Sequence, residues 1–156
     1  MIEPAGPGPD TPETLREFPV VVPLEVQWGD QDAFDHVNNV VYFRWCETAR
    51  VVYLMRIGMW KLIEAEGRGP IVAAISCQFR RPVTFPDTVW VGARVSRAGN
   101  SSFTMEHRIV SQALDATVAD AESTLVFFDY REQQPVPLPD HLREAIAKLE
   151  GTGGAS

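Results

Sequence analysis

Cysteine, histidine and long hydrophobic runs are scarce in this sequence, and each scarcity excludes a class of protein. The two cysteines, Cys46 and Cys77, stand too far apart for a disulfide framework or a zinc site. The three histidines form no metal-binding motif. No apolar run approaches the roughly 20 residues of a membrane span, and the N-terminus lacks the basic start and apolar stretch of a signal peptide. We therefore expect a cytoplasmic protein without a metal site.

Positive charge is also in the minority. The chain has 14 Lys and Arg against 21 Asp and Glu, a net charge of −7, which argues against binding to nucleic acid or to an anionic membrane surface. Between residues 56 and 108, however, eight Lys and Arg stand against four Asp and Glu. An anionic ligand can therefore bind, provided that it contacts this segment.

The length and composition predict one globular domain. The chain has 156 residues, of which 45% are hydrophobic, enough to bury a core without cross-links. Residues 1–18 hold four prolines and almost no apolar side chain, so we expect a disordered leader there. The predicted domain spans residues 19–150, and residues 151–156, GTGGAS, are expected to be a flexible tail.

The hydrophobic patterns predict an α+β fold. Residues 20–28 are rich in β-formers, residues 39–57 have a helical period with apolar side chains on nearly every side, and residues 139–149 form a last amphipathic helix. Period-two alternation predicts antiparallel strands at 71–80, 89–96, 103–109 and 117–128. A helix this apolar needs more cover than one sheet face provides. We expect the sheet to curl around it and a second subunit to cover the rest.

A polar loop precedes this helix and is the best candidate for chemistry. It contains Asp30, Asp32, Asp35, His36, Asn38 and Asn39. A helix N-terminus offers free N–H groups and partial positive charge, so a carboxylate beside it suits hydrolysis of an activated carbonyl. The alternative is that one side chain caps the helix and the others only solvate the loop. The sequence contains no G-x-S-x-G, phosphate-loop or G-x-G-x-x-G motif that would favour another chemistry.

Residues 26–50, VQWGDQDAFDHVNNVVYFRWCETAR, resemble the signature of the 4-hydroxybenzoyl-CoA thioesterase family of hotdog-fold acyl-CoA thioesterases. The matching elements are a strand ending in D-x-D, the HVNN sequence and a helix reading Y-x-x-W-x-E-x-A-R. Two later segments, FRRPVTFPDTVWV at 79–91 and GNSSF at 99–103, resemble the strand–turn–strand and the hairpin that follow in the family. The resemblance covers roughly residues 20–130.

The resemblance implies a hotdog fold, in which a curved five-stranded antiparallel sheet wraps one long central helix. It also implies a homodimer or homotetramer whose subunits join their sheets edge to edge, and an acyl-CoA substrate that is hydrolysed to free acid and CoA. No metal or redox cofactor is expected, because coenzyme A is part of the substrate. Two alternatives stay open: a hotdog enoyl-thioester hydratase or dehydratase using Asp32 and His36, and a non-catalytic module that binds acyl-CoA or acyl-carrier protein.

The resemblance also assigns roles by position. Asp32 matches the catalytic carboxylate, the backbone N–H of Asn39 matches the donor that polarises the carbonyl, and His36 shapes the catalytic loop. The residues implied in substrate binding are Asn38, Tyr42, Arg80, Arg81, Ser101 and Ser102. The family often has glycine where this chain has Asp35, and some hotdog enzymes use a helix glutamate instead of the loop aspartate. We interpret that glutamate, Glu47, as a structural partner of Arg44 or Arg50.

Overall fold

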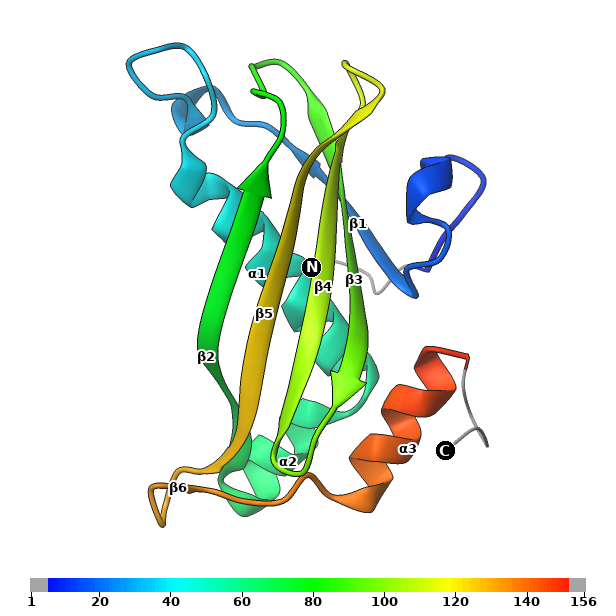
Figure 1. Ribbon diagram of the computed structural model, residues 1–156, viewed down its shortest axis with the longest axis vertical. Coiled ribbons are helices and arrows are strands. Elements are labelled where there is room, and N and C mark those ends of the chain that lie inside the picture. Colours follow the sequence, from blue (N-terminus) through cyan, green and yellow to red (C-terminus); the bar gives the residue numbers. More distant parts are fainter. Residues whose placement is uncertain (1–5, 152–156) are drawn as a thin grey trace.

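One antiparallel sheet curls around a long helix (Figure 1). The computed structural model describes residues 6–151. The strands are β1 (Val20–Glu25), β2 (Arg68–Phe79), β3 (Thr88–Ala98), β4 (Ser102–Ser111), β5 (Ala116–Asp129) and β6 (Gln134–Pro135); the helices are α1 (Asn39–Arg56), α2 (Met59–Glu66) and α3 (Asp140–Leu149), with 3-10 turns at Glu13–Leu15 and Trp28–Asp30. The sheet order is β1-β3-β4-β5-β2, and β6 pairs with β5. The predicted α+β hotdog fold is confirmed, and the short strand β6 is an addition too brief to show alternation.

Helix α1 begins and ends where its sequence provides a start and a stop. Asn38 has extended backbone, and its side chain accepts the N–H of Val40 at 3.1 Å, which caps the helix. Gly58 follows the last turn with φ +81°, a left-handed conformation that glycine adopts without strain. No helix between residues 6 and 151 is both long and apolar enough to cross a membrane.

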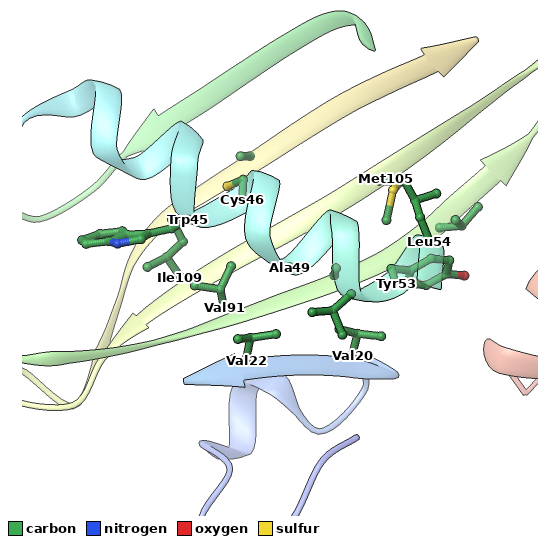
Figure 2. Close-up of a cluster of buried hydrophobic side chains, with 14 of the residues drawn as sticks. Val20, Val22, Trp45, Cys46, Ala49, Tyr53, Leu54, Val91, Met105 and Ile109 are labelled. Atoms are coloured by element: carbon green, nitrogen blue, oxygen red, sulfur yellow. The ribbon is translucent and has the colours of Figure 1, made fainter. Parts of the chain in front are cut away.

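The core lies between α1 and the concave face of the sheet (Figure 2). Buried side chains of the helix meet buried side chains of β1, β3 and β4; they include Trp45, Cys46, Ala49, Tyr53, Val20, Val22, Val91, Met105 and Ile109. Burying one such large apolar side chain contributes about 1.5–3 kcal/mol. Because α1 packs chiefly on β1 and β3, the edge strand β2 keeps exposed apolar side chains.

Residues 11–18 differ from the disordered leader that their composition predicts. Leu15 is fully buried and Phe18 is 2% exposed, on the outer face of the sheet. Both pack on Gly92, where an added Cβ would lie 2.7 Å from Cγ of Phe18. Leu15 and Phe18 can pack on the sheet because Gly92 has no side chain at that point. The proline-rich composition of the segment gives no sign of this packing. Residues 1–5 of the predicted leader and 152–156 of the predicted tail lie outside the described residues.

Candidate active site

The polar loop before α1 is a closed turn. Gln31 and Val37 form an antiparallel bridge, and inside it the N–H of Asp32 donates to the carbonyl oxygen of His36 at 2.8 Å. Asp35 has φ +60°, the left-handed region that glycine favours and that aspartate tolerates better than most residues. The family's frequent glycine at this position therefore corresponds to a backbone requirement, which Asp35 meets.

The carboxylate of Asp32 is exposed and oriented. Its Oδ1 accepts the backbone N–H of Phe34 at 2.8 Å. Among the hydrogen bonds of residues 6–151, none involves the second oxygen, Oδ2. One oxygen is thus held by the loop, and the other is available to a reacting group.

The first turn of α1 supplies a free donor beside this loop. Asn38, the cap residue, is tied to the loop because its N–H donates to the carbonyl oxygen of Asp30 at 2.9 Å. Asn39 is the first helical residue, where a backbone N–H has no acceptor within the helix and lies at the positive end of the helix dipole. For Asn38, capping is therefore an established structural role; for Asn39, the N–H is available for an oxyanion.

A cavity of about 300 Å³ joins this helix end to the end of β2. It is lined by His36, Val37, Asn39, Tyr42, Phe79, Arg80, Arg81 and Pro82. Five predicted site residues therefore meet in one cavity, while Asp32 lies one backbone hydrogen bond away, through His36. We call this hollow the α1–β2 pocket.

Aromatic rings form the apolar wall of the α1–β2 pocket. The ring centroid of Tyr42 lies 5.1 Å from that of Phe79, edge on, and 5.1 Å from that of Trp45. Burial raises the pKa of Tyr42 above its ordinary value, so its hydroxyl stays neutral. This wall of the pocket is therefore apolar and uncharged.

The two arginines of the pocket differ in their partners. The Nε of Arg80 donates to Oδ2 of Asp120 at 2.8 Å. Arg81 is exposed and has no ion-pair partner within residues 6–151. Both can present guanidinium groups to an anion at the pocket.

Ser101 and Ser102 are not brought to the α1–β2 pocket of their own chain. They lie in the β3–β4 hairpin, whereas the loop before α1 contacts the opposite end of β3, where Gln31 Oε1 accepts the N–H of Phe85 at 3.2 Å (Figure 1). The 11 residues of β3 separate these ends, about 35 Å at about 3.3 Å per residue.

Residues 26–146 match the thioesterase-like superfamily. The chain belongs to this family. A thioesterase of Thermus thermophilus, solved with coenzyme A and Zn, is 36% identical with a TM-score of 0.77, covering 86% of this chain and 96% of that one. The protein PA5185 of Pseudomonas aeruginosa is 33% identical with a TM-score of 0.76, covering 86% and 94%. The long-chain acyl-CoA thioesterase FadM of Escherichia coli is 26% identical over 81% of this chain and 96% of its own length.

Family membership confirms the resemblance read from residues 26–50 and the expected class of enzyme, a thioester hydrolase. Within residues 6–151, no group of three or more His, Cys, Asp or Glu is placed to hold a metal ion.

Burial lowers the pKa of Arg50 and the negative charge of Glu47 opposes this shift, so the two residues interact electrostatically. Glu47 is nevertheless exposed and makes no close ion pair with Arg44 or Arg50 within residues 6–151. The reason is that Arg50 turns inward: it is 7% exposed, and its Nη1 has no hydrogen-bond partner in residues 6–151. The sequence pattern gave no sign of this burial.

Two further groups were not among the predicted site residues. His107 lies in the core, 1% exposed, with its Nε2 3.3 Å from the hydroxyl oxygen of Ser123. Asp120, which holds Arg80, was missed because it lies on an alternating strand like any solvated residue. No signal in the sequence links it to Arg80, 40 positions earlier.

Proposed function

We propose that this family member is an acyl-CoA thioesterase that hydrolyses an acyl-CoA to a free acid and coenzyme A in the cytoplasm. The observation that carries the proposal is that Asn39, the first helical residue, lines a pocket whose neighbouring loop presents the Asp32 carboxylate. The acyl-CoA activity of FadM and the coenzyme A bound by the Thermus thermophilus relative support the substrate class. Both cysteines are free thiols, which suits a reducing compartment.

In the proposed reaction the thioester carbonyl oxygen accepts the N–H of Asn39, which stabilises the developing oxyanion. Oδ2 of Asp32 either attacks the carbonyl carbon or removes a proton from an attacking water. The C–S bond then breaks, and coenzyme A leaves as a thiolate that takes up a proton. Direct attack gives a mixed anhydride that a water molecule hydrolyses to the free acid. No metal or redox cofactor enters either route.

The other predicted residues bind or position the substrate. His36 holds the Asp32 backbone through its carbonyl, and Asn38 fixes the helix start. Tyr42 packs the acyl or thioester region against Phe79, while Arg80 and Arg81 take the phosphates of coenzyme A.

The proposed assembly is a homodimer, or a tetramer of two such dimers, joined through the free edge of β2. The other sheet edge, β1, contains Pro23, which has no N–H to donate to another strand. Strand β2 is 12 residues long, and several of its apolar side chains are exposed, namely Ile71, Val72, Ile75 and Phe79. Such an edge requires a cover. In this assembly Ser101 and Ser102 bind substrate only in the pocket of another copy.

The direct test is free-thiol release from short, medium, long and aromatic acyl-CoAs. Turnover on any member supports the proposal, and the preferred chain length defines the acyl pocket. Binding of CoA esters without turnover on the panel would contradict it and favour a binding module.

A further inference from the structure

The outer face of the sheet carries a row of contacts that begins at the N-terminal segment. Gly92, Arg108 and Asp120 are neighbours across β3, β4 and β5. Phe18 lies on Gly92, and the guanidinium of Arg108 lies 5.6 Å from the Phe18 ring centroid. Arg108 Nη1 also donates to the carbonyl oxygen of Thr14 at 3.2 Å. Residues 14–18 therefore hold Arg108 in one place.

Asp120 extends this row to the α1–β2 pocket. Its Oδ1 accepts the Nε of Arg108 at 2.9 Å, and its Oδ2 accepts the Nε of Arg80 at 2.8 Å. Burial disfavours the charged carboxylate, but the hydrogen bonds from Arg108 and Arg80 outweigh it and hold the pKa of Asp120 below its usual range. Because the bond uses Nε of Arg80, both terminal nitrogens of that guanidinium remain free for an anion.

A second arginine on the same face provides an internal comparison. Arg94 lies 4.5 Å from the Phe18 ring centroid and donates to Glu106 at 2.9 Å. This pair has the same anchor and the same chemistry as Arg108–Asp120. Arg94 also forms an ion pair with Glu17 at 3.6 Å, but within residues 6–151 neither Arg94 nor Glu106 forms an ion pair with a residue that lines the α1–β2 pocket.

We propose that Asp120 is a positioning residue for coenzyme A. Arg108, which residues 14–18 hold in place, fixes Asp120, and Asp120 holds the Arg80 guanidinium at the α1–β2 pocket, where it binds a phosphate group of coenzyme A. This rests on the proposed function for its substrate. Residues 14–18 lie outside the part of the chain that matches the family, residues 26–146.

The test compares wild type, Asp120→Asn, Phe18→Leu and the control Glu106→Gln in the full chain. Calorimetry measures binding of coenzyme A, 3′-dephospho-CoA and pantetheine, and thiol release measures kcat and KM for an acyl-CoA and for the acyl-N-acetylcysteamine thioester, which has no phosphate. We expect Asp120→Asn to weaken coenzyme A binding about tenfold and raise the acyl-CoA KM similarly, with kcat within twofold. Pantetheine binding and the KM for the phosphate-free thioester change much less. Phe18→Leu shows a smaller shift in the same direction, and Glu106→Gln shows none.

The ligands that lack phosphates show which phosphate Arg80 binds. If Asp120→Asn does not weaken binding of 3′-dephospho-CoA, Arg80 binds the 3′-phosphate; if it weakens that binding as much as binding of coenzyme A, Arg80 binds the pyrophosphate. An equal loss with and without phosphates, an equal loss in Glu106→Gln, or no loss in Asp120→Asn would each overturn the inference. Phosphate-dependent binding without any turnover would support the inference while rejecting the proposed thioesterase.

Discussion

The backbone N–H of Phe34 donates to Oδ1 of Asp32 at 2.8 Å, so the loop itself orients the carboxylate that the family resemblance assigns to catalysis. The bond closes within two residues and needs no distant partner. An asparagine at position 32 keeps this acceptor, because its amide oxygen can take the same N–H. The loop conformation and the charge at position 32 can therefore be separated by mutation.

Asp32→Asn should retain the fold and lose at least 100-fold in kcat, because the amide is neither a nucleophile nor a base. Initial rates of thiol release and circular dichroism spectra provide the measurement. The matched control is Asp35→Asn, in the same exposed loop at a φ that asparagine also tolerates, and it should stay within about threefold. Wild-type rates in Asp32→Asn would remove Asp32 from the mechanism.

Asn39→Pro tests the oxyanion donor directly. Proline is well accepted at the first helical position and lacks only the N–H, and Asn38 already has the extended backbone, φ −61° and ψ 138°, that precedes proline. We expect kcat to fall about 100- to 1,000-fold, the range for loss of an oxyanion donor, with little change in melting temperature.

Asn39→Ala separates the side chain from the backbone. It keeps the N–H and should cost far less activity than the proline variant. Similar losses in both variants would show that the Asn39 side chain matters, and that the helix N–H does not polarise the carbonyl.

Regular elements were predictable because their signals are local. Helix α1 was expected over 39–57 and spans Asn39–Arg56, since its cap at Asn38 and its stop at Gly58 both lie in the adjoining sequence. The segment 11–18 was not predictable. Its order depends on Leu15 and Phe18 packing on Gly92, about 75 positions later, and only the folded sheet brings these residues together.

The candidate site also contains some relations that were predictable from local sequence and others that were not. Asp32 and Asn39 belong to one local motif, so the sequence alone placed both near the helix start. The bond from Arg80 to Asp120 depends on strand pairing across 40 positions, and the remoteness of Ser101 from the pocket depends on the direction of β3. These relations are properties of the tertiary structure.

The left-handed backbone of Asp35, φ +60°, predicts how substitutions at this position change the free energy of unfolding. Valine at this position should destabilise the fold by about 1–2 kcal/mol, because a branched side chain is strained there. Glycine should stay within about 1 kcal/mol of wild type, since relief of strain offsets its greater freedom in the unfolded chain. Urea unfolding measures both changes. Ala33→Val, in the same exposed loop at an ordinary φ, should change stability by less than about 0.5 kcal/mol; an equal cost at both positions would argue against backbone strain.

His107 predicts a loss of stability in acid. Burial and the neighbouring charge of Arg50 lower the pKa of His107 from 6.5 to about 3. Between these values the unfolded chain binds the proton and the folded protein does not, so the free energy of unfolding falls as the pH falls, by up to about 1.4 kcal/mol per pH unit. Urea titrations from pH 7 to 4.5 should show this dependence reduced in His107→Gln. Equal slopes for both proteins would mean that His107 does not titrate differently on folding.

Strand β2 predicts the oligomeric state. Ile75 is 39% exposed near the middle of β2, on the side of the sheet that faces α1 but beyond the part that the helix covers. A lysine there would place a charge in the proposed interface, where an unpaired buried charge costs several kcal/mol. We expect light scattering to give at least a dimer for wild type and a folded monomer for Ile75→Lys. Leu114→Lys, which charges a similarly exposed apolar residue in the β4–β5 turn, should leave the mass unchanged. A monomeric wild type, or an Ile75→Lys protein of unchanged mass, would show that β2 does not join the subunits.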